Sequence, residues 1–451
     1  MGWILGCLPP ALAVIAISRL APSRDRLAIV AVTIGLAFGA TSVTWGGWFL
    51  VGVRPRAVLL GLDAAAWLLI AIAAFVFRRK NRETLAYSLP RPSSSRAMTI
   101  ATTALLLMAA SVAVTSFVAW SAVFPHGEWD AWAQWNLRAR FFFRGFESGA
   151  WRNAFAPVLA WSHADYPPLV PLSVARLWLY VGRDTTAAPI AFAAAIAVAT
   201  VASAGFGAAR TRGAARGCLA ALAIVASPSF VRYAPAQYAD IPLGFFMLSA
   251  FILWGYADAP RGRLWLALAG LSAALAAWTK NEGIPFLVLF VLIVAVERVR
   301  KHGAAGWREV AVFAVGAAPV VLLLLFFKEA LAPPSYFVAE QSLQQAIEKL
   351  FDFDRVRLVF GSVSREAWLS GATHVGVLPF LVSFAVVRGV DPNAPIPAKI
   401  AAPAMVAMLA IYTVAYIVTP KDLAWQLKTS LDRLIVQLVP TLAWSIATIA
   451  K

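Results

Sequence analysis

Apolar runs of about twenty residues recur along the whole chain, separated by short polar or basic connectors. A run of that length crosses the hydrocarbon core of a bilayer as an α-helix. Only helices and closed barrels satisfy their backbone groups in lipid, and the sequence lacks the alternating pattern of barrel strands. The pattern therefore predicts an all-α fold, a polytopic transmembrane helical bundle of about 13 spans. These spans cover 3–20, 27–51, 57–77, 98–122, 187–208, 216–231, 241–257, 263–279, 284–297, 308–328, 374–388, 399–418 and 433–450.

The basic connectors between the apolar runs predict the orientation of the spans. Residues 78–96 and 297–309 are rich in Lys and Arg, so the positive-inside rule places both in the cytoplasm. Counting forward from 78–96, the large loop 123–186 lies outside. A further apolar stretch, 167–182, would move 297–309 to the outside if it crossed the membrane. We therefore expect 167–182, which holds Arg176 and three prolines, to be a re-entrant or interfacial helix within the outer loop.

This topology divides the chain into four parts. They are extra N-terminal transmembrane helices at 1–97, a core with its outer loop 123–186 at 98–328, an extracytoplasmic loop at 329–373, and C-terminal transmembrane helices at 374–451. Within the extracytoplasmic loop, the polar segment 341–360 is predicted to lie on the outer surface as an amphipathic helix.

Composition supports this interpretation. Only 14% of the residues are charged, against about 25% in soluble domains. The net charge of +17 is explained by the cytoplasmic loops, and no nucleic-acid motif is present, so no nucleic-acid partner is expected. Cys7 and Cys218 form neither a disulfide framework nor a metal-binding spacing. The first apolar segment lacks a basic region before it, so we interpret it as a helix rather than a cleaved signal.

The stretch from Gly127 to Gly145 concentrates acids, tryptophans and arginines in the predicted outer loop. Tryptophan favours the membrane interface, which explains Trp132 and its neighbours. Interfacial anchoring does not explain Glu128 and Asp130. We therefore predict both acids as candidate catalytic groups.

Four further motifs place charged side chains on the same predicted side of the membrane. Charges near the apolar zone are costly, so they are functional candidates by default. Each has a plainer explanation as well, namely helix capping, a polar turn or interfacial anchoring. The candidate binding residues are His163, Asp165 and Tyr166 in HADYPPL, Asp240 at the start of a span, Lys280 and Glu282 in a turn, and Lys428 and Arg433 at the last span.

The order of three motifs resembles the polytopic GT-C glycosyltransferases, the class that includes the protein mannosyltransferases and the aminoarabinose transferases of lipid A. The motifs are GEWDAW at 127–132, HADYPPL at 163–169 and DIPL at 240–243. The resemblance covers roughly 98–300, and the C-terminal part more loosely. Three predicted spans precede the one that would open such a core, which weakens helix-by-helix equivalence. The lack of a large C-terminal soluble domain argues against transfer onto protein asparagine.

The resemblance implies a glycosyltransferase that moves a sugar from a polyprenyl phosphate donor to an envelope glycan, lipid or protein acceptor. Asp130 would be the catalytic base, Lys280, Lys428 and Arg433 would bind the donor phosphate, and the ring of Trp132 would stack on the sugar. No cofactor is implied, and the sequence does not demand the carboxylate-held divalent metal that some relatives use. The implied location is a bacterial inner membrane, with membrane lipid around the chain and the active site on the extracytoplasmic side.

Two other functions remain open at the level of sequence. A transporter or flippase of a lipid-linked or polar substrate would place polar groups near mid-membrane in two related halves, and no internal repeat is visible. A non-catalytic membrane assembly protein would tolerate Asp130→Asn without loss of function.

Overall fold

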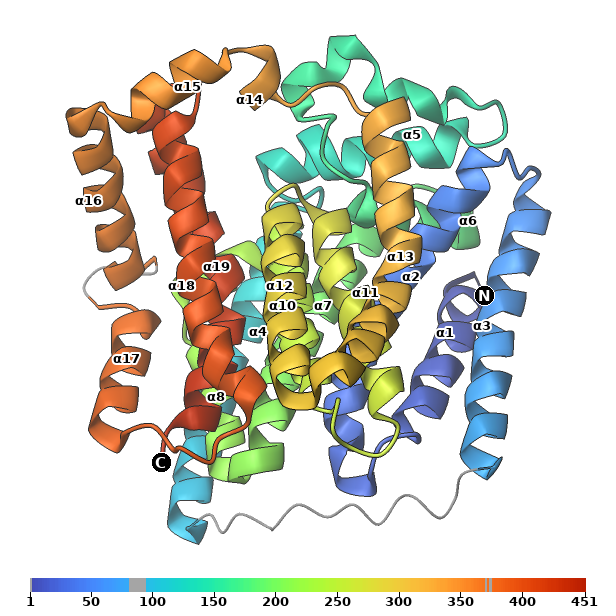
Figure 1. Cartoon of the computed structure of the whole chain (residues 1–451). Coiled ribbons are helices and arrows are strands. Elements are labelled where there is room, and N and C mark those ends of the chain that lie inside the picture. The colour runs from blue at the N-terminus through green and yellow to red at the C-terminus, as the bar shows by residue number, and fades with distance from the viewer. Residues whose placement is uncertain (1, 81–94, 370, 373–374) are drawn as a thin grey trace.

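The computed structural model describes residues 2–80, 95–369, 371–372 and 375–451. These residues form a bundle of helices that run up and down the molecule, with a cap of shorter helices at the upper end in Figure 1. No strand occurs within the described ranges; one isolated bridge joins Val390 to Ala450. The predicted all-α helical bundle is therefore confirmed.

The described residues of the N-terminal half form seven α-helices, with several short helical turns in the loop that follows α4. A π-helical turn, Ala131–Trp135, precedes α5, and two 3-10 turns, Ala150–Phe155 and Pro157–Ser162, follow it. The α-helices are α1 (Gly2–Ser18), α2 (Arg26–Leu50), α3 (Arg56–Lys80), α4 (Arg96–Val123), α5 (Asn136–Gly145), α6 (Leu169–Val181) and α7 (Ala187–Arg212).

The C-terminal half completes the bundle and supplies part of the cap. Its helices are α8 (Ala214–Val225), α9 (Pro228–Tyr233), α10 (Asp240–Trp254), α11 (Gly262–Thr279), α12 (Gly283–His302), α13 (Gly306–Ala330), α14 (Tyr336–Ala339), α15 (Leu343–Leu350), α16 (Phe353–Leu369), α17 (Val377–Arg388), α18 (Ile396–Val418) and α19 (Leu423–Ile449).

Six helical stretches in the described part of the chain are long and apolar enough to cross a membrane. They are residues 26–50, 56–78, 96–123, 187–212, 283–330 and 396–418. Most of the other predicted spans correspond to apolar helices of ten to seventeen residues, including α1, α8, α10 and α17. The basic connector 78–96, on which the predicted orientation depends, lies largely outside the described residues. The total of about 13 spans stays a prediction.

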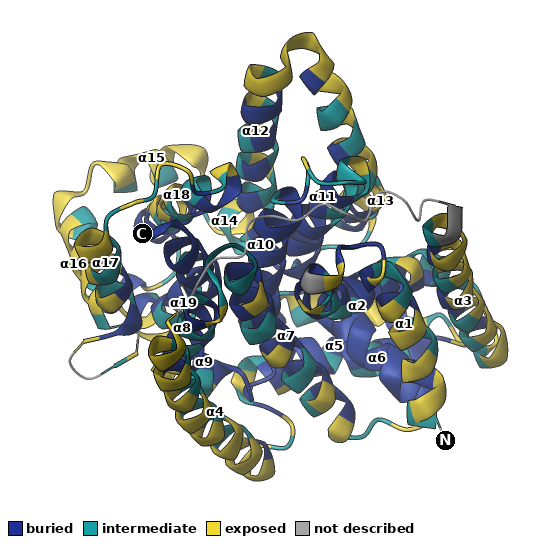
Figure 2. Cartoon of the chain, turned by 90° about the horizontal axis from the view of Figure 1, so that it is seen from below, coloured by how far each residue is buried: buried dark blue, intermediate teal, exposed yellow. Residues whose placement is uncertain are grey.

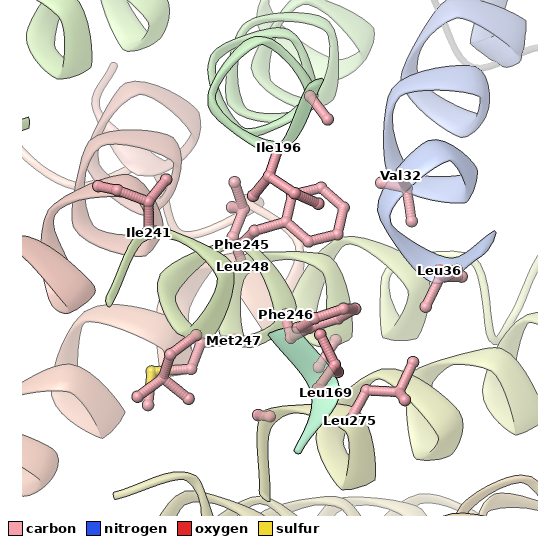
Figure 3. Packing of buried hydrophobic residues seen from close by; sticks show 14 of the residues in the cluster. Val32, Leu36, Leu169, Ile196, Ile241, Phe245, Phe246, Met247, Leu248 and Leu275 are labelled. Atoms are coloured by element: carbon pink, nitrogen blue, oxygen red, sulfur yellow. The ribbon is translucent and has the colours of Figure 1, made fainter. Parts of the chain in front are cut away.

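Helix α10 is the centre of the core. All of its residues are buried, and Phe245, Phe246 and Leu248 interlock with side chains from the surrounding helices (Figure 3). Gly244 lets α10 contact the backbone of α19, because a Cβ there would lie 2.7 Å from the carbonyl oxygen of Gln437. The same packing holds Asp240, the first residue of α10, between α11 and α19.

The last helix, α19, is longer than its predicted span. It begins at Leu423, where the Asp422 carboxylate accepts a hydrogen bond of 2.7 Å from the backbone N–H of Trp425 and caps the helix. Arg433 therefore lies in the third turn of the helix and does not open it as predicted. Helix α19 runs from the cap down to the C-terminus in Figure 1, and ten residues of the helix precede Arg433.

Helix α6 and the segments around it form a buried polar anchor. The Arg176 guanidinium lies 2.6 Å from the Asp63 carboxylate, which also accepts hydrogen bonds from the indole of Trp45 and the hydroxyl of Tyr180. Twelve of the thirteen residues of α6 are buried. At 1.5 Å per residue the helix is about 20 Å long, shorter than the roughly 30 Å hydrocarbon core. Sequence analysis identified Arg176 but missed its partner Asp63.

The described residues of the predicted outer loop 329–373 form three helices, α14, α15 and α16. Helix α15 begins with a capping box formed by Ser342 and Gln345. The predicted single surface helix at 341–360 is instead broken near residue 351, and α16 turns down to pack against α18 and α19. The reason is a cluster of apolar side chains that α16 shares with α18 and α19, including Val359 and Val363.

Candidate functional site

Asp240 is the most deeply buried charged residue of the candidate site. Its carboxylate is fully buried and accepts hydrogen bonds from Lys280 at 3.0 Å, from Gln437 at 2.6 Å and from Arg433 at 3.1 and 3.2 Å. The helix N-cap is Ala239, and Asp240 makes no side-chain capping bond. The plainer explanation of Asp240 as a helix cap is therefore wrong.

Arg433 joins Asp240 to the predicted catalytic acid. Its Nη2 lies 2.6 Å from Asp130 Oδ2 and 3.1 Å from Asp240 Oδ2. The guanidinium also lies over the ring of Tyr238, 4.4 Å from the centroid, and the Tyr238 hydroxyl accepts the Asp130 backbone N–H at 3.4 Å. Gln437 lies one helical turn after Arg433, so both face Asp240 from α19.

Lys280 extends the ionic chain on the other side. Its ammonium lies 3.0 Å from Asp240 and 2.8 Å from Glu282, and only 4% of the side chain is exposed. Five groups of alternating charge therefore connect four segments that are distant in sequence. In order along this chain, which we call the ionic relay, they are Asp130, Arg433, Asp240, Lys280 and Glu282.

Local backbone geometry carries Asp130 to this position. Gly127 has a positive φ of 77°, and a Cβ there would lie 2.4 Å from Ala131 and 2.7 Å from the Ala236 carbonyl oxygen. This close approach lets the Glu128 backbone N–H donate to Ala236. The π-helical turn that follows Asp130 widens the helix by one residue per turn, a feature often found at functional sites.

The other predicted residues of the first motif lie away from the ionic relay. The Glu128 carboxylate accepts a 2.9 Å hydrogen bond from the indole of Trp120, at the upper end of α4. Trp132 is exposed and packs edge-on against Trp129. The structure therefore places the two acids of the motif apart and brings only Asp130 into the relay.

HADYPPL provides a second polar group beside the relay. Asp165 accepts a 2.6 Å hydrogen bond from the Asn281 amide, and Lys328 donates to both the Asp165 carbonyl and the Asn281 side-chain oxygen at 2.6 Å. Tyr166 stacks on Trp135 and lies beneath the Lys280 ammonium. Through these contacts the second motif is bonded to Asn281, the residue that follows Lys280.

His163 adopts a left-handed conformation with φ 52° at the end of a 3-10 turn. Burial lowers the pKa of its imidazole below the ordinary value of 6.5, against the opposing effects of Asp165 and Asp130. The His163 ring lies 5.6 Å from that of Tyr336 on α14. Tyr336 also accepts a hydrogen bond from Gln426 on α19, so α14 connects the two sides of the site from above.

Lys428 lies outside the ionic relay: its side chain is exposed, and it makes no hydrogen bond or ion pair with another described residue. Two other cations contact the site without a carboxylate within 4.0 Å among the described residues, namely Lys328 and Arg138. Burial lowers the pKa of Arg138 to about 10, and its guanidinium donates to Ser162.

Sequence reasoning missed several members of the site. Gln437 had a detectable signal, since an amide one turn after Arg433 in an apolar run is unusual. Lys328 and Asn281 gave little signal, because a lysine at a helix end and an asparagine in a turn are common. Tyr336 gave none, because its position depends on how α14 folds over the bundle.

The residues that the structure describes contain no group of three or more His, Cys, Asp or Glu side chains placed to hold a metal ion. No protein-family model matches the chain, and no curated protein or solved structure matches it. The interpretation of the site therefore depends on its own geometry.

Proposed function

We propose that the chain is a membrane glycosyltransferase that moves a sugar from a polyprenyl phosphate donor to an acceptor hydroxyl at the upper end of the bundle. The observation that carries the proposal is the contact of Asp130 with Arg433, a carboxylate and a guanidinium held together at a partly exposed position. Asp130 and Arg433 side chains are 14% and 13% exposed, whereas Asp240 behind them is fully buried.

The reaction requires both groups. The acceptor oxygen bonds to the anomeric carbon as the bond between that carbon and the phosphate oxygen breaks. A positioned carboxylate, here Asp130, takes the hydroxyl proton. The transition state develops positive charge on the sugar, and the polyprenyl phosphate leaves with the electron pair of the broken bond. Cations stabilise that leaving group without having to protonate it.

Arg433 and Lys280 suit the phosphate role because Asp240 holds both in place. A guanidinium presents several N–H donors in a fork that matches phosphate oxygens. Binding of a phosphate to Arg433 would also release Asp130 from its present partner and free it to act as a base. Lys328 is a third candidate cation, since its contacts in the structure are neutral oxygens.

The proposal includes the membrane arrangement. We place about 13 spans in a bacterial inner membrane, with α6 not crossing and the ionic relay facing the extracytoplasmic side. The support for this topology is the positive-inside rule, which a crossing of 167–182 would break at the basic segment 297–309. The acceptor is an envelope glycan, lipid or protein.

The test uses purified protein in nanodiscs with radiolabelled polyprenyl phosphate sugars and a membrane extract as acceptor source. Asp130→Asn is expected to abolish transfer while donor binding persists. Asp432→Asn is a matched control, because Asp432 precedes Arg433 in the chain but does not belong to the relay. Its carboxylate accepts a hydrogen bond from the Tyr233 hydroxyl instead. Full transfer by Asp130→Asn would remove Asp130 from the role of base. Movement of the donor across the bilayer without any transfer would favour a flippase.

A further inference from the structure

The loop that carries Asp130 follows a helix that gives it little support. Helix α4 stands at the edge of the molecule with most of its length exposed (Figure 2), and of its residues only Thr102 and Ser121 are buried. Helix α10, by contrast, lies at the centre of the bundle and is buried throughout (Figure 2). The position of Asp130 therefore depends on how the loop after α4 is attached to the residues that precede α10.

Two buried amide side chains make this attachment. Asn136, the first residue of α5, donates from Nδ2 to the His126 carbonyl at 3.2 Å and to Gln237 Oε1 at 2.8 Å. These two acceptors use both hydrogens of the Asn136 amide. Gln237 donates in turn from Nε2 to the Pro125 carbonyl at 3.3 Å. Asn136 and Gln237, which are 2% and 4% exposed and which we call the amide clamp, thus hold the backbone just before Gly127.

The backbone at Gln237 adopts an uncommon conformation. Its φ is 61°, in the left-handed region that a residue with a Cβ adopts only at an energetic cost. On one side of it, the Ala236 carbonyl accepts the Glu128 N–H at 3.3 Å. On the other side, the Tyr238 hydroxyl accepts the Asp130 N–H at 3.4 Å. Glycine suits this backbone best but would lack the side-chain contacts of the clamp.

Asp130 is therefore attached in two different ways. Its carboxylate pairs with Arg433 at 2.6 Å, and its backbone is attached through the amide clamp and the bonds to 236–238. A phosphate that binds Arg433 competes for the first attachment, because it offers the guanidinium another anion. It does not compete for the second attachment, whose donors and acceptors are all neutral. Once phosphate is bound, the second attachment alone determines where the Asp130 carboxylate lies.

The same segment continues into the residue that places the cations. Asp240, three residues after Gln237, contacts both Arg433 and Lys280. The loop of the proposed base and the cations proposed to bind phosphate are therefore attached to one short stretch of chain. A displacement of about 1 Å can cost about 100-fold in the rate of a positioned reaction, so this attachment matters for transfer.

We infer that Asn136 and Gln237 are positioning residues for the proposed transfer, which keep Asp130 in place while Arg433 turns to the donor phosphate. This role rests on the proposed function, because it assigns how the same base is held during the reaction. A purely structural role would lower stability and leave the kinetic constants of the folded protein unchanged.

Hydrogen–deuterium exchange of peptides that cover 127–133, measured in nanodiscs, reports on the loop directly. Without a lipid phosphate, we expect Asn136→Ala to exchange nearly as slowly as the wild type, because the pair of Asp130 and Arg433 remains. Polyprenyl phosphate, added as the probe, is expected to raise exchange about tenfold in Asn136→Ala, which lacks two buried hydrogen bonds, and to leave the wild type unchanged. An equal rise in the wild type would overturn the inference.

Substitution of the ion pair gives the same test without a ligand. Asp130→Asn alone is expected to leave the exchange of 127–133 near the wild-type rate, because the amide clamp remains. Combined with Asn136→Ala, it is expected to raise exchange about tenfold in the absence of polyprenyl phosphate. A rise in Asp130→Asn alone that equals the rise in the double variant would show that the ion pair, and not the clamp, holds the loop.

The transfer assay then tests the consequence for the reaction. We expect kcat to fall about tenfold in Asn136→Ala and in Gln237→Gly, which relieves the left-handed backbone, while the donor Kd changes less than about twofold. Both residues act through one contact, so the double variant should be no slower than the slower single variant. Asp63→Asn, which breaks a buried ion pair elsewhere, is the control for lost stability and should keep its kcat.

The outcomes separate the positioning role from the proposed function. An unchanged kcat in both clamp variants would overturn the positioning role and leave the proposed glycosyltransferase standing. Absence of transfer by any form of the protein would overturn the proposed function. The exchange of 127–133 would then still decide whether the amide clamp holds the loop when the ion pair is removed.

Discussion

The ionic relay makes a quantitative prediction for Asp240→Asn. The wild-type carboxylate faces two cations at about 3 Å. At an effective dielectric constant of about 20, each contact is worth about 5 kcal/mol of Coulomb attraction. Most of that sum offsets the cost of burying three charges, several kcal/mol per ion. The substitution removes the attraction and leaves Lys280 and Arg433 buried without their shared partner.

We therefore expect Asp240→Asn to lower the free energy of unfolding by about 3–5 kcal/mol, the usual cost of breaking a buried ion pair. At roughly 2 °C per kcal/mol for a large chain, the Tm falls by about 6–10 °C. Unfolding of the detergent-solubilised protein, followed by tryptophan fluorescence, measures both quantities. The asparagine keeps the side-chain volume, so packing changes contribute little.

Two further variants test the electrostatic origin of that loss. Glu282→Gln removes one partly exposed partner of Lys280 and is expected to cost only about 1 kcal/mol. Asp240→Asn combined with Lys280→Met removes both charges of one pair and is expected to recover part of the stability of Asp240→Asn. A Tm of Asp240→Asn within 2 °C of the wild type, or a double variant less stable than the single one, would refute the reasoning.

Three other predictions concern residues around the relay. Asp63→Asn should lower the free energy of unfolding by about 3–5 kcal/mol in the same assay, because it leaves the buried Arg176 without its carboxylate partner. Donor binding should be unchanged, and its loss would contradict a purely structural role for this ion pair. Lys428→Ala should change donor affinity less than twofold in a binding titration, since the side chain is exposed; a tenfold loss would place Lys428 in the site after all. Burial lowers the pKa of His163 in the folded state, so below a pH of about 6.5 the unfolded chain binds more protons than the folded chain and the protein becomes less stable. In His163→Asn, whose asparagine tolerates the left-handed backbone, the Tm should therefore fall less between pH 7.5 and 5.5 than in the wild type. An equal fall in Tm would show that His163 does not cause the pH dependence.

Much of the architecture followed from the sequence because hydrophobic periodicity is a local property. The apolar runs identified the positions of nearly all the long helices, and the short α6 was singled out because a crossing there would put the basic segment 297–309 outside. The pattern was less informative where polar and apolar residues mix. It placed the start of α19 ten residues late and missed the break between α15 and α16, because both depend on which neighbouring helix covers the segment.

The candidate site shows the same division. The sequence alone determined that charged side chains from several motifs fall near the ends of apolar runs. An unpaired charge is costly there, so these side chains are candidates for a functional site. Only the tertiary structure decided that Asp130, Asp240, Lys280 and Arg433 form one relay and that Lys428 stays outside it. The reason is that ion pairing depends on distances of a few ångströms between helices far apart in sequence, and the packing of α10 against α11 and α19 sets those distances.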